Sequence, residues 1–163
     1  MKHILVVVDI QKDFVDGALG TAEAVAIVER AAKKINAFVG DIFGTYDTHF
    51  ENYLDTTEGK HLPVPHCIKG TKGWEIADGL YVEGAKIIDK PNFGWPHWNE
   101  ETFENVELIG LCTDICVVSN ALIIKATFPD AQVKVDSACC AGVTPESHEA
   151  ALKTMQMCQV EVV

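Results

Sequence analysis

The sequence predicts an α/β fold with three layers, in which a mainly parallel six-stranded sheet is flanked by helices. Two observations lead to this prediction. Short apolar runs alternate along the chain with amphipathic segments, and the apolar runs are continuous enough to be buried on both faces. Parallel strands need crossover connections, so the helices should cover both faces of the sheet. The chain of 163 residues has the ordinary length of one domain, which we expect to span residues 1–163.

The expected strands are short runs rich in valine, isoleucine and leucine. They cover residues 4–8, 41–46, 86–89, 106–111, 132–136 and 159–163. No internal repeat or linker separates them.

Three helices are expected between these strands. Apolar residues recur at helical spacing over 22–39. A second helix starts near Thr113, its expected N-cap, and a third runs from Pro145 to about Cys158 with proline in its first turn. The region 47–80 is longer than an ordinary connection, and long ordered insertions are usually functional.

Charge and composition narrow the class of function. The formal net charge is −11, which disfavours nucleic acid and anionic membrane surfaces as partners because phosphate binding needs a basic footprint. No apolar run has the length of a membrane span or a signal peptide, so we expect a cytoplasmic protein with a small-molecule substrate. The six cysteines are then expected to be reduced, with no disulfide framework or zinc ribbon.

Three reactive residues stand at the ends of expected strands. Asp9 ends the first strand, Lys90 follows 86–89, and Cys116 lies just past 106–111. Ligands of open parallel sheets bind beyond the carboxyl ends of the strands, so these side chains should face one crevice. At the head of a helix and near a lysine, the Cys116 thiol should be acidified and nucleophilic.

Each of these residues also has a structural interpretation. Cys116 alone would be read as a buried, inert helix cysteine, and Asp9 with Lys90 as an ion pair at the edge of the core. Together, however, carboxylate, ammonium and thiol provide a base, an electrostatic clamp and a nucleophile.

Five segments of the chain carry a resemblance to a known family. They are Asp9–Phe14, Asp89–Lys90, Gly110–Val117, Asp136–Cys139 and Pro145–Leu152, of which Gly-x-x-Thr-Asp-x-Cys-Val is the most specific. In these motifs the chain resembles the isochorismatase-like cysteine hydrolases, over nearly its whole length, and in particular their nicotinamidase-like branch. The resemblance implies a parallel sheet flanked by helices, an Asp9–Lys90–Cys116 triad and Cys116 as the nucleophile.

The resemblance also implies how the substrate oxygen is held. The Leu111–Cys112 peptide bond is expected to be cis, which would turn the Cys112 amide toward the substrate. The backbone N–H groups of Cys112 and Cys116 would then form an oxyanion hole, while the Cys112 side chain only packs.

A metal site is expected in the long insertion. Asp47 and His49 lie two apart at a strand end, and a carboxylate with imidazoles suits zinc, iron or manganese. Two loop histidines are more often solvated than ligating, but the nicotinamidase branch carries a metal on an Asp-x-His…His pattern that these residues and His66 match. By the same resemblance Glu58 completes the ligands, with His61 as the competing residue, and zinc is the favoured metal.

The substrate implied by the resemblance is nicotinamide, whose ring nitrogen would bind the metal while its amide lies beside Cys116. This activity belongs to NAD salvage. Aromatic residues should wall the ring, with Phe14 favoured. The other candidates are Tyr46, Trp74, Phe93 and Trp95. Every one of these aromatic residues fits a place in the core or at an interface equally well.

Several alternatives remain at this point. The nearest is a hydrolase of the same family that acts on a carbamoyl or ureido amide. An isochorismatase proper is disfavoured because vinyl-ether hydrolysis uses no thiol, and a non-enzymatic scaffold protein is more remote. The stretch between Lys90 and Val106 is short, so the sequence does not determine which residues form the lid and the pocket walls. Self-association into a homo-oligomer is expected from the resemblance.

Overall fold

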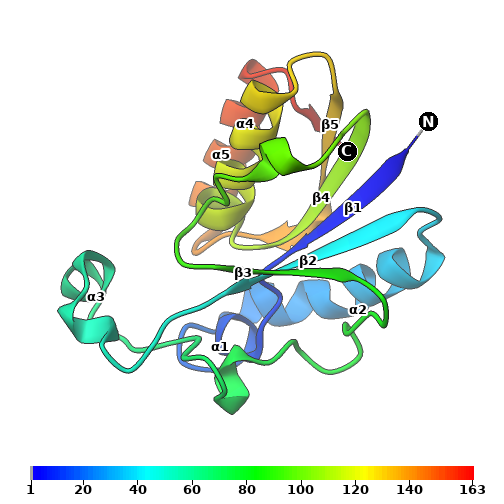
Figure 1. The fold of residues 1–163 in the computed structure, drawn as a ribbon. Coiled ribbons are helices and arrows are strands. Elements are labelled where there is room, and N and C mark those ends of the chain that lie inside the picture. Colours follow the sequence, from blue (N-terminus) through cyan, green and yellow to red (C-terminus); the bar gives the residue numbers. More distant parts are fainter. Residues whose placement is uncertain (1) are drawn as a thin grey trace.

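Six parallel strands form one sheet in the computed structural model, which describes residues 2–163 (Figure 1). Across the sheet the strands follow the order β3-β2-β1-β4-β5-β6, and every pair is parallel. The strands are β1 His3–Val8, β2 Asp41–Asp47, β3 Lys86–Lys90, β4 Asn105–Leu111, β5 Gln132–Ala141 and β6 Glu161–Val162. The predicted fold class is confirmed.

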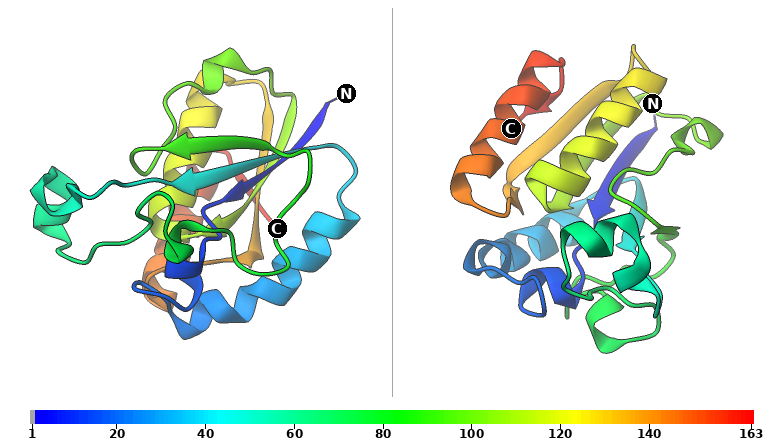
Figure 2. Two further views of the ribbon diagram at one scale, coloured as in Figure 1. Left: turned by 60° about the horizontal axis from the view of Figure 1, so that its bottom comes forward. Right: turned by 90° about the vertical axis from the view of Figure 1, so that its left-hand side faces the viewer.

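Helices cover both faces of this sheet (Figure 2). One face carries α1 (Lys12–Val15) and the long α2 (Ala22–Ala37), and the other carries α4 (Val118–Thr127) and α5 (Pro145–Met157). The short α3 (Thr57–His61) lies beyond the carboxyl end of β2, within the predicted irregular insertion. Within residues 2–163 no helix is both long and apolar enough to cross a membrane.

Alternating side chains of the central strands supply two cores. On β1, Val7 faces α2 and packs in one cluster with Ile27, whereas Val6 faces the other side with Ile124 of α4 and Met155 of α5. All five residues are buried. Burying each such side chain contributes about 1.5–3 kcal/mol, so the strand pattern fixes the three-layer arrangement and aligns the strand ends.

The chain after β4 departs from the prediction. Thr113 is not an N-cap: the residue before the turn is Cys112, which makes no side-chain cap. Residues 113–117 form a wide turn of π-helical type, and α4 continues from it. The Thr113 hydroxyl instead lies 2.7 Å from His148 Nδ1 of α5, because this buried side chain finds its partner on the neighbouring helix.

Two strands differ from their predicted ranges by more than one residue. β5 continues to Ala141, past the predicted end at 136, because an irregularity in β4 between Leu108 and Gly110 lets the two strands pair again further on. β6 is limited to Glu161–Val162.

Gly110 is required where β4 passes β1. Its φ is +128°, and a Cβ there would collide with the backbone carbonyl of Val8, directly before Asp9. We expect Gly110→Ala to lower the free energy of unfolding by about 3 kcal/mol, since strain and overlap add. Gly70→Ala is the control, because Gly70 also has a positive φ but open space around it, and it should cost about 1 kcal/mol. Equal losses in urea denaturation would contradict this account.

Candidate active site

Three reactive side chains meet at the carboxyl end of the sheet. Asp9 follows β1, Lys90 ends β3, and Cys116 lies in the wide turn after β4. Lys90 Nζ lies 2.6 Å from Asp9 Oδ2 and 3.5 Å from Cys116 Sγ. Asp9 and Lys90 are fully buried, and Cys116 is 4% exposed. The structure thus brings the three residues of the expected triad together; their catalytic roles remain a prediction.

Asp9 is held in place by the neighbouring strand. Its Oδ1 accepts a hydrogen bond of 2.7 Å from Thr45 Oγ1 on β2, and its backbone N–H donates to the Thr45 carbonyl. Its φ is +46°, a conformation that aspartate tolerates better than most residues. Sequence reasoning missed Thr45, since nothing local marks a threonine inside a strand as a partner of Asp9.

Charges within the triad set its resting protonation. Burial opposes the ammonium of Lys90, but Asp9, Cys116 and Asp47 outweigh it and hold the Lys90 pKa above its usual value. Burial raises the pKa of Asp9 to about 6, against the opposing effect of Lys90. Lys90 is therefore charged, and Asp9 becomes a carboxylate near neutral pH.

The Cys116 thiol differs from the sequence prediction. Burial raises its pKa well above the usual value, and the Asp9 carboxylate raises it further, with only Lys90 acting in the opposite direction. The expectation of a thiol acidified by a helix terminus is thus wrong for the free protein, because desolvation outweighs the favourable groups. To act as a nucleophile, this thiol would need a base to take its proton, and the Asp9 carboxylate lies in the same buried cluster.

The pKa of Asp9 predicts how activity depends on pH. Only the carboxylate form accepts a proton, so kcat/KM should fall as the pH drops through about 6, the folded-state pKa of Asp9. The measurement is a profile of kcat/KM against pH. Thr45→Val removes a hydrogen bond that lowers the Asp9 pKa, so its acidic limb should move to higher pH. An acidic limb near the usual aspartate pKa, or one that Thr45→Val leaves in place, would contradict Asp9 as the base.

Four potential metal ligands gather next to this triad. Asp47, His49, Glu58 and His66 each offer one atom, and these atoms lie within 4.8 Å of one another. The Nε2 atoms of His49 and His66 are 3.0 and 3.3 Å from Asp47 Oδ2, and 3.5 and 3.6 Å from Glu58 Oε1. The competing residue His61 is exposed, with Nδ1 against the Thr57 carbonyl, and it is not part of the group.

The protonation of this group suits a cation. The Val64 carbonyl can only accept a hydrogen bond, so His66 Nδ1 carries a proton, and Nε2 is the ring nitrogen that faces Asp47 and Glu58. Burial opposes the charge on Asp47, but hydrogen bonds from His49 and His66 outweigh it and hold the Asp47 pKa well below its usual value. Asp47 Oδ1 is buried without a hydrogen-bond partner. Two imidazoles and two carboxylates match the ligands of zinc, iron or manganese.

Gln11 joins the metal group to the start of the chain. Its fully buried amide donates to the carbonyls of Asp47 and Trp74, both at 2.9 Å, and its Oε1 accepts from the Asp47 N–H at 2.8 Å. Both backbone groups of one ligand are therefore fixed by a single side chain. The sequence signal was present, because Gln11 lies in the Asp9 motif, but its partner is 36 residues away.

The predicted wall residues are placed differently from one another. Phe14 lies beside the metal group, with its ring centroid 5.5 Å from that of His66. Tyr46 and Trp74 contact each other at 5.0 Å, and Tyr46 points to the face of β2 opposite Asp47. Phe93, 40% exposed, belongs to the segment after Lys90.

The fifth aromatic residue, Trp95, also follows Lys90. It is partly buried and packs against the core beneath α4 and α5.

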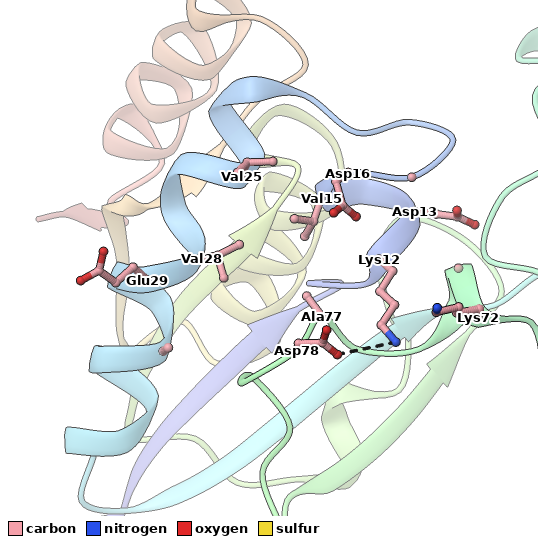
Figure 3. Close-up of a pocket in the computed structure, with 13 residues that line it drawn as sticks. Lys12, Asp13, Val15, Asp16, Val25, Val28, Glu29, Lys72, Ala77 and Asp78 are labelled. Atoms are coloured by element: carbon pink, nitrogen blue, oxygen red, sulfur yellow. Dashed lines mark ion pairs between the residues drawn. The ribbon is translucent and has the colours of Figure 1, made fainter.

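A separate groove of about 790 Å³ runs between α1, α2 and residues 72–78 (Figure 3). Val25 and Val28 of α2 line its apolar side, and Lys12, paired with Asp78 at 3.7 Å, lies opposite. No residue of the triad or the metal group lines it. The reactive side chains therefore lie outside this groove.

Comparison with known proteins gives this geometry a family. The isochorismatase domain model matches residues 3–163. The chain belongs to the isochorismatase family. Two relatives of known structure share its fold over nearly its full length. The pyrazinamidase of Pyrococcus horikoshii, determined in complex with zinc, has a TM-score of 0.87 and 28% identity, and the match covers 100% of this chain and 99% of that one.

The second structure is the N-carbamoylsarcosine amidase of Thermoplasma acidophilum, with a TM-score of 0.80 and 26% identity over 99% of this chain and 95% of that one. A curated relative, the nicotinamidase/pyrazinamidase of Mycobacterium tuberculosis, is 25% identical over 98% of this chain and 97% of its own length. The family of the chain was thus predicted correctly, and the Leu111–Cys112 peptide is cis, as expected for it.

Proposed function

We propose that this chain is a metal-dependent nicotinamidase, which converts nicotinamide and water into nicotinate and ammonia through a thioester on Cys116. The observation that carries the proposal is the contact between the metal group and the triad. Lys90 Nζ lies 3.8 Å from Asp47 Oδ1 and 3.5 Å from Cys116 Sγ. A ring bound at one group could therefore present its amide to the other.

The class of the enzyme follows from its family. The chain is a cysteine hydrolase of the isochorismatase family that acts on carbon–nitrogen bonds of amides. What the proposal adds is the ring substrate, the metal dependence and the roles of individual residues.

Acylation begins with proton transfer from the Cys116 thiol to the Asp9 carboxylate. The sulfur forms a bond to the amide carbon, and the backbone N–H groups of Cys112 and Cys116 hold the oxyanion. Asp9 then returns the proton to the leaving nitrogen, the carbon–nitrogen bond breaks and ammonia departs. Lys90 stays charged beside Asp9 and keeps the two proton-carrying groups together.

Deacylation uses the same carboxylate. Asp9 takes a proton from water, the oxygen attacks the thioester carbon, and the thiol leaves with that proton as the acid is released. Asp47, His49, Glu58 and His66 would hold the metal ion. When bound, the metal supplies a Lewis acid for the lone pair of a ring nitrogen, with zinc favoured.

The main rival is a carbamoyl or ureido amide as substrate. It is supported by the likeness to the N-carbamoylsarcosine amidase. The metal group favours nicotinamide, because a substrate without a ring nitrogen has less use for a metal ion held by these four residues.

The test measures ammonia release by zinc-loaded protein from nicotinamide, from benzamide and from an N-carbamoyl amino acid. The proposal expects release from nicotinamide, and far slower release from benzamide because benzamide lacks only the ring nitrogen. Equal rates on these two compounds would overturn the ring-nitrogen anchor. Release from the carbamoyl compound alone would establish the rival.

A further inference from the structure

One buried polar residue of α4 has no part in the chemistry described so far. Asn120 is fully buried, one turn after Cys116, in a helix whose other inward-facing residues include Ala121 and Ile124. A buried amide in such a place is costly unless its hydrogen bonds are made. Its partners therefore indicate what it does.

The side chain of Asn120 makes four hydrogen bonds, which is its full capacity. Its Nδ2 donates to the carbonyls of Cys116 at 2.8 Å and Phe93 at 3.1 Å. Its Oδ1 accepts from the Trp95 N–H at 2.9 Å and from Trp98 Nε1 at 3.0 Å. Three of the four partners lie in residues 91–98, which we call the Lys90 loop because it follows Lys90 directly.

The Lys90 loop in turn holds the catalytic ammonium. Lys90 Nζ donates to the Asn92 carbonyl at 3.0 Å, one residue before the carbonyl that Asn120 binds. At the far end of the loop, Trp98 is fully buried and packs against Phe43, with ring centroids 6.4 Å apart. Figure 1 shows this segment turning back from the end of β3 to lie against α4.

We propose that Asn120 is a positioning residue. It fixes the Lys90 loop to the turn of residues 113–117 and thereby sets the ammonium of Lys90 against the sulfur of Cys116. One side chain bonds the Cys116 carbonyl on the helix side and three groups on the loop side. Lys90 ends β3 and Cys116 lies in the turn after β4, and among the described residues Asn120 bonds directly to both the loop and the turn. The inference deepens the proposed function and rests on it for its kinetic part.

If Asn120 only stabilised its own helix, a smaller polar side chain would be sufficient. A serine hydroxyl can donate to the carbonyl four residues back, which would replace the bond to Cys116. It cannot also reach the loop with two acceptor sites and a second donor. Asn120→Ser therefore separates the helix bond from the loop bonds, and Asn120→Ala removes both.

The experiment compares both variants with Val135→Ala, a fully buried residue of β5 whose side chain makes no hydrogen bond to the loop or the turn and which controls for lost stability. The first readout is the rate at which iodoacetamide alkylates Cys116 at one fixed pH, followed by peptide mass spectrometry. The second readout is kcat and KM for nicotinamide. The alkylation readout needs no substrate, so it remains decisive if nicotinamide is not hydrolysed.

We expect both Asn120 variants to lower the alkylation rate at least threefold and kcat by about tenfold or more, because small displacements of reacting groups are costly. Val135→Ala should match wild type in both. If Asn120→Ser has the rates of wild type, or if both Asn120 variants have the rates of Val135→Ala, then Asn120 has only a structural role and the proposal is overturned. Faster alkylation would show that the loop merely covers the sulfur, which would also overturn the proposal. If the Asn120 variants are alkylated more slowly as expected but the wild-type protein releases no ammonia from nicotinamide, the positioning role stands and nicotinamide is rejected as the substrate.

Discussion

Replacing Cys116 by alanine should lower ammonia release from nicotinamide by on the order of 10⁴-fold or more. The reason is chemical: no other described thiol lies against both reactive groups, since Lys90 Nζ is 3.5 Å from Cys116 Sγ and 2.6 Å from Asp9 Oδ2. The loss should appear in kcat, because the metal group that would hold the ring is untouched. Steady-state kinetics with an ammonia assay measure it.

A second cysteine variant controls for loss of a thiol. Cys158 is exposed at the end of α5, and Cys158→Ala should keep wild-type kinetics. Cys116→Ser should be nearly as inactive as Cys116→Ala, since a buried hydroxyl is much harder to ionise than a thiol. Activity of Cys116→Ala within tenfold of wild type would exclude covalent catalysis by this residue.

Removing the metal should have the second largest effect. We expect His49→Ala, or exhaustive chelation of wild type, to lower kcat/KM by about 100-fold or more, because the ring would lose its anchor. A ligand that binds only the folded state stabilises it by about 2.7 kcal/mol at 100 times its Kd, so chelation should also lower the Tm of wild type. His49→Ala should have this lower Tm already and should not respond to the chelator.

His61→Ala is the matched control for a lost histidine. It lies three residues from Glu58, yet its side chain is exposed and outside the ligand group. Its metal content, measured by elemental analysis, should equal that of wild type. Equal metal loss in the two histidine variants would place the metal elsewhere, and a stoichiometric metal in His49→Ala would contradict the ligand set.

The arrangement of the sheet was predictable because it depends on local patterns. Strand runs such as 4–8 and 106–111 are apolar on both faces, and that alone indicates a covered parallel sheet. The rule that strand ends carry function then brings Asp9, Lys90 and Cys116 to one edge. The metal group followed from the spacing of Asp47 and His49 together with the family resemblance.

Other features depend on contacts that no local pattern encodes. Thr45 and Gln11 each act through partners 36 residues away, and Asn120 through a loop 22 to 27 residues before it. The Cys116 pKa was misjudged because the position in the turn was visible in the sequence but the depth of burial was not. Asn120 did leave a trace, as an amide within an apolar helical stretch.

The central claim is that the Cys116 sulfur attacks a carbonyl carbon attached to a pyridine ring. Pyridine-3-carbaldehyde, labelled with ¹³C at its aldehyde carbon, tests this most directly. A thiol adds to the aldehyde carbon, but the adduct has no nitrogen to expel, so the reaction stops at the tetrahedral adduct. With zinc-loaded wild type, the carbon NMR spectrum should show a protein-bound tetrahedral signal that is absent with Cys116→Ala. The same bound signal in both proteins, or none in either at saturating aldehyde, would contradict the account.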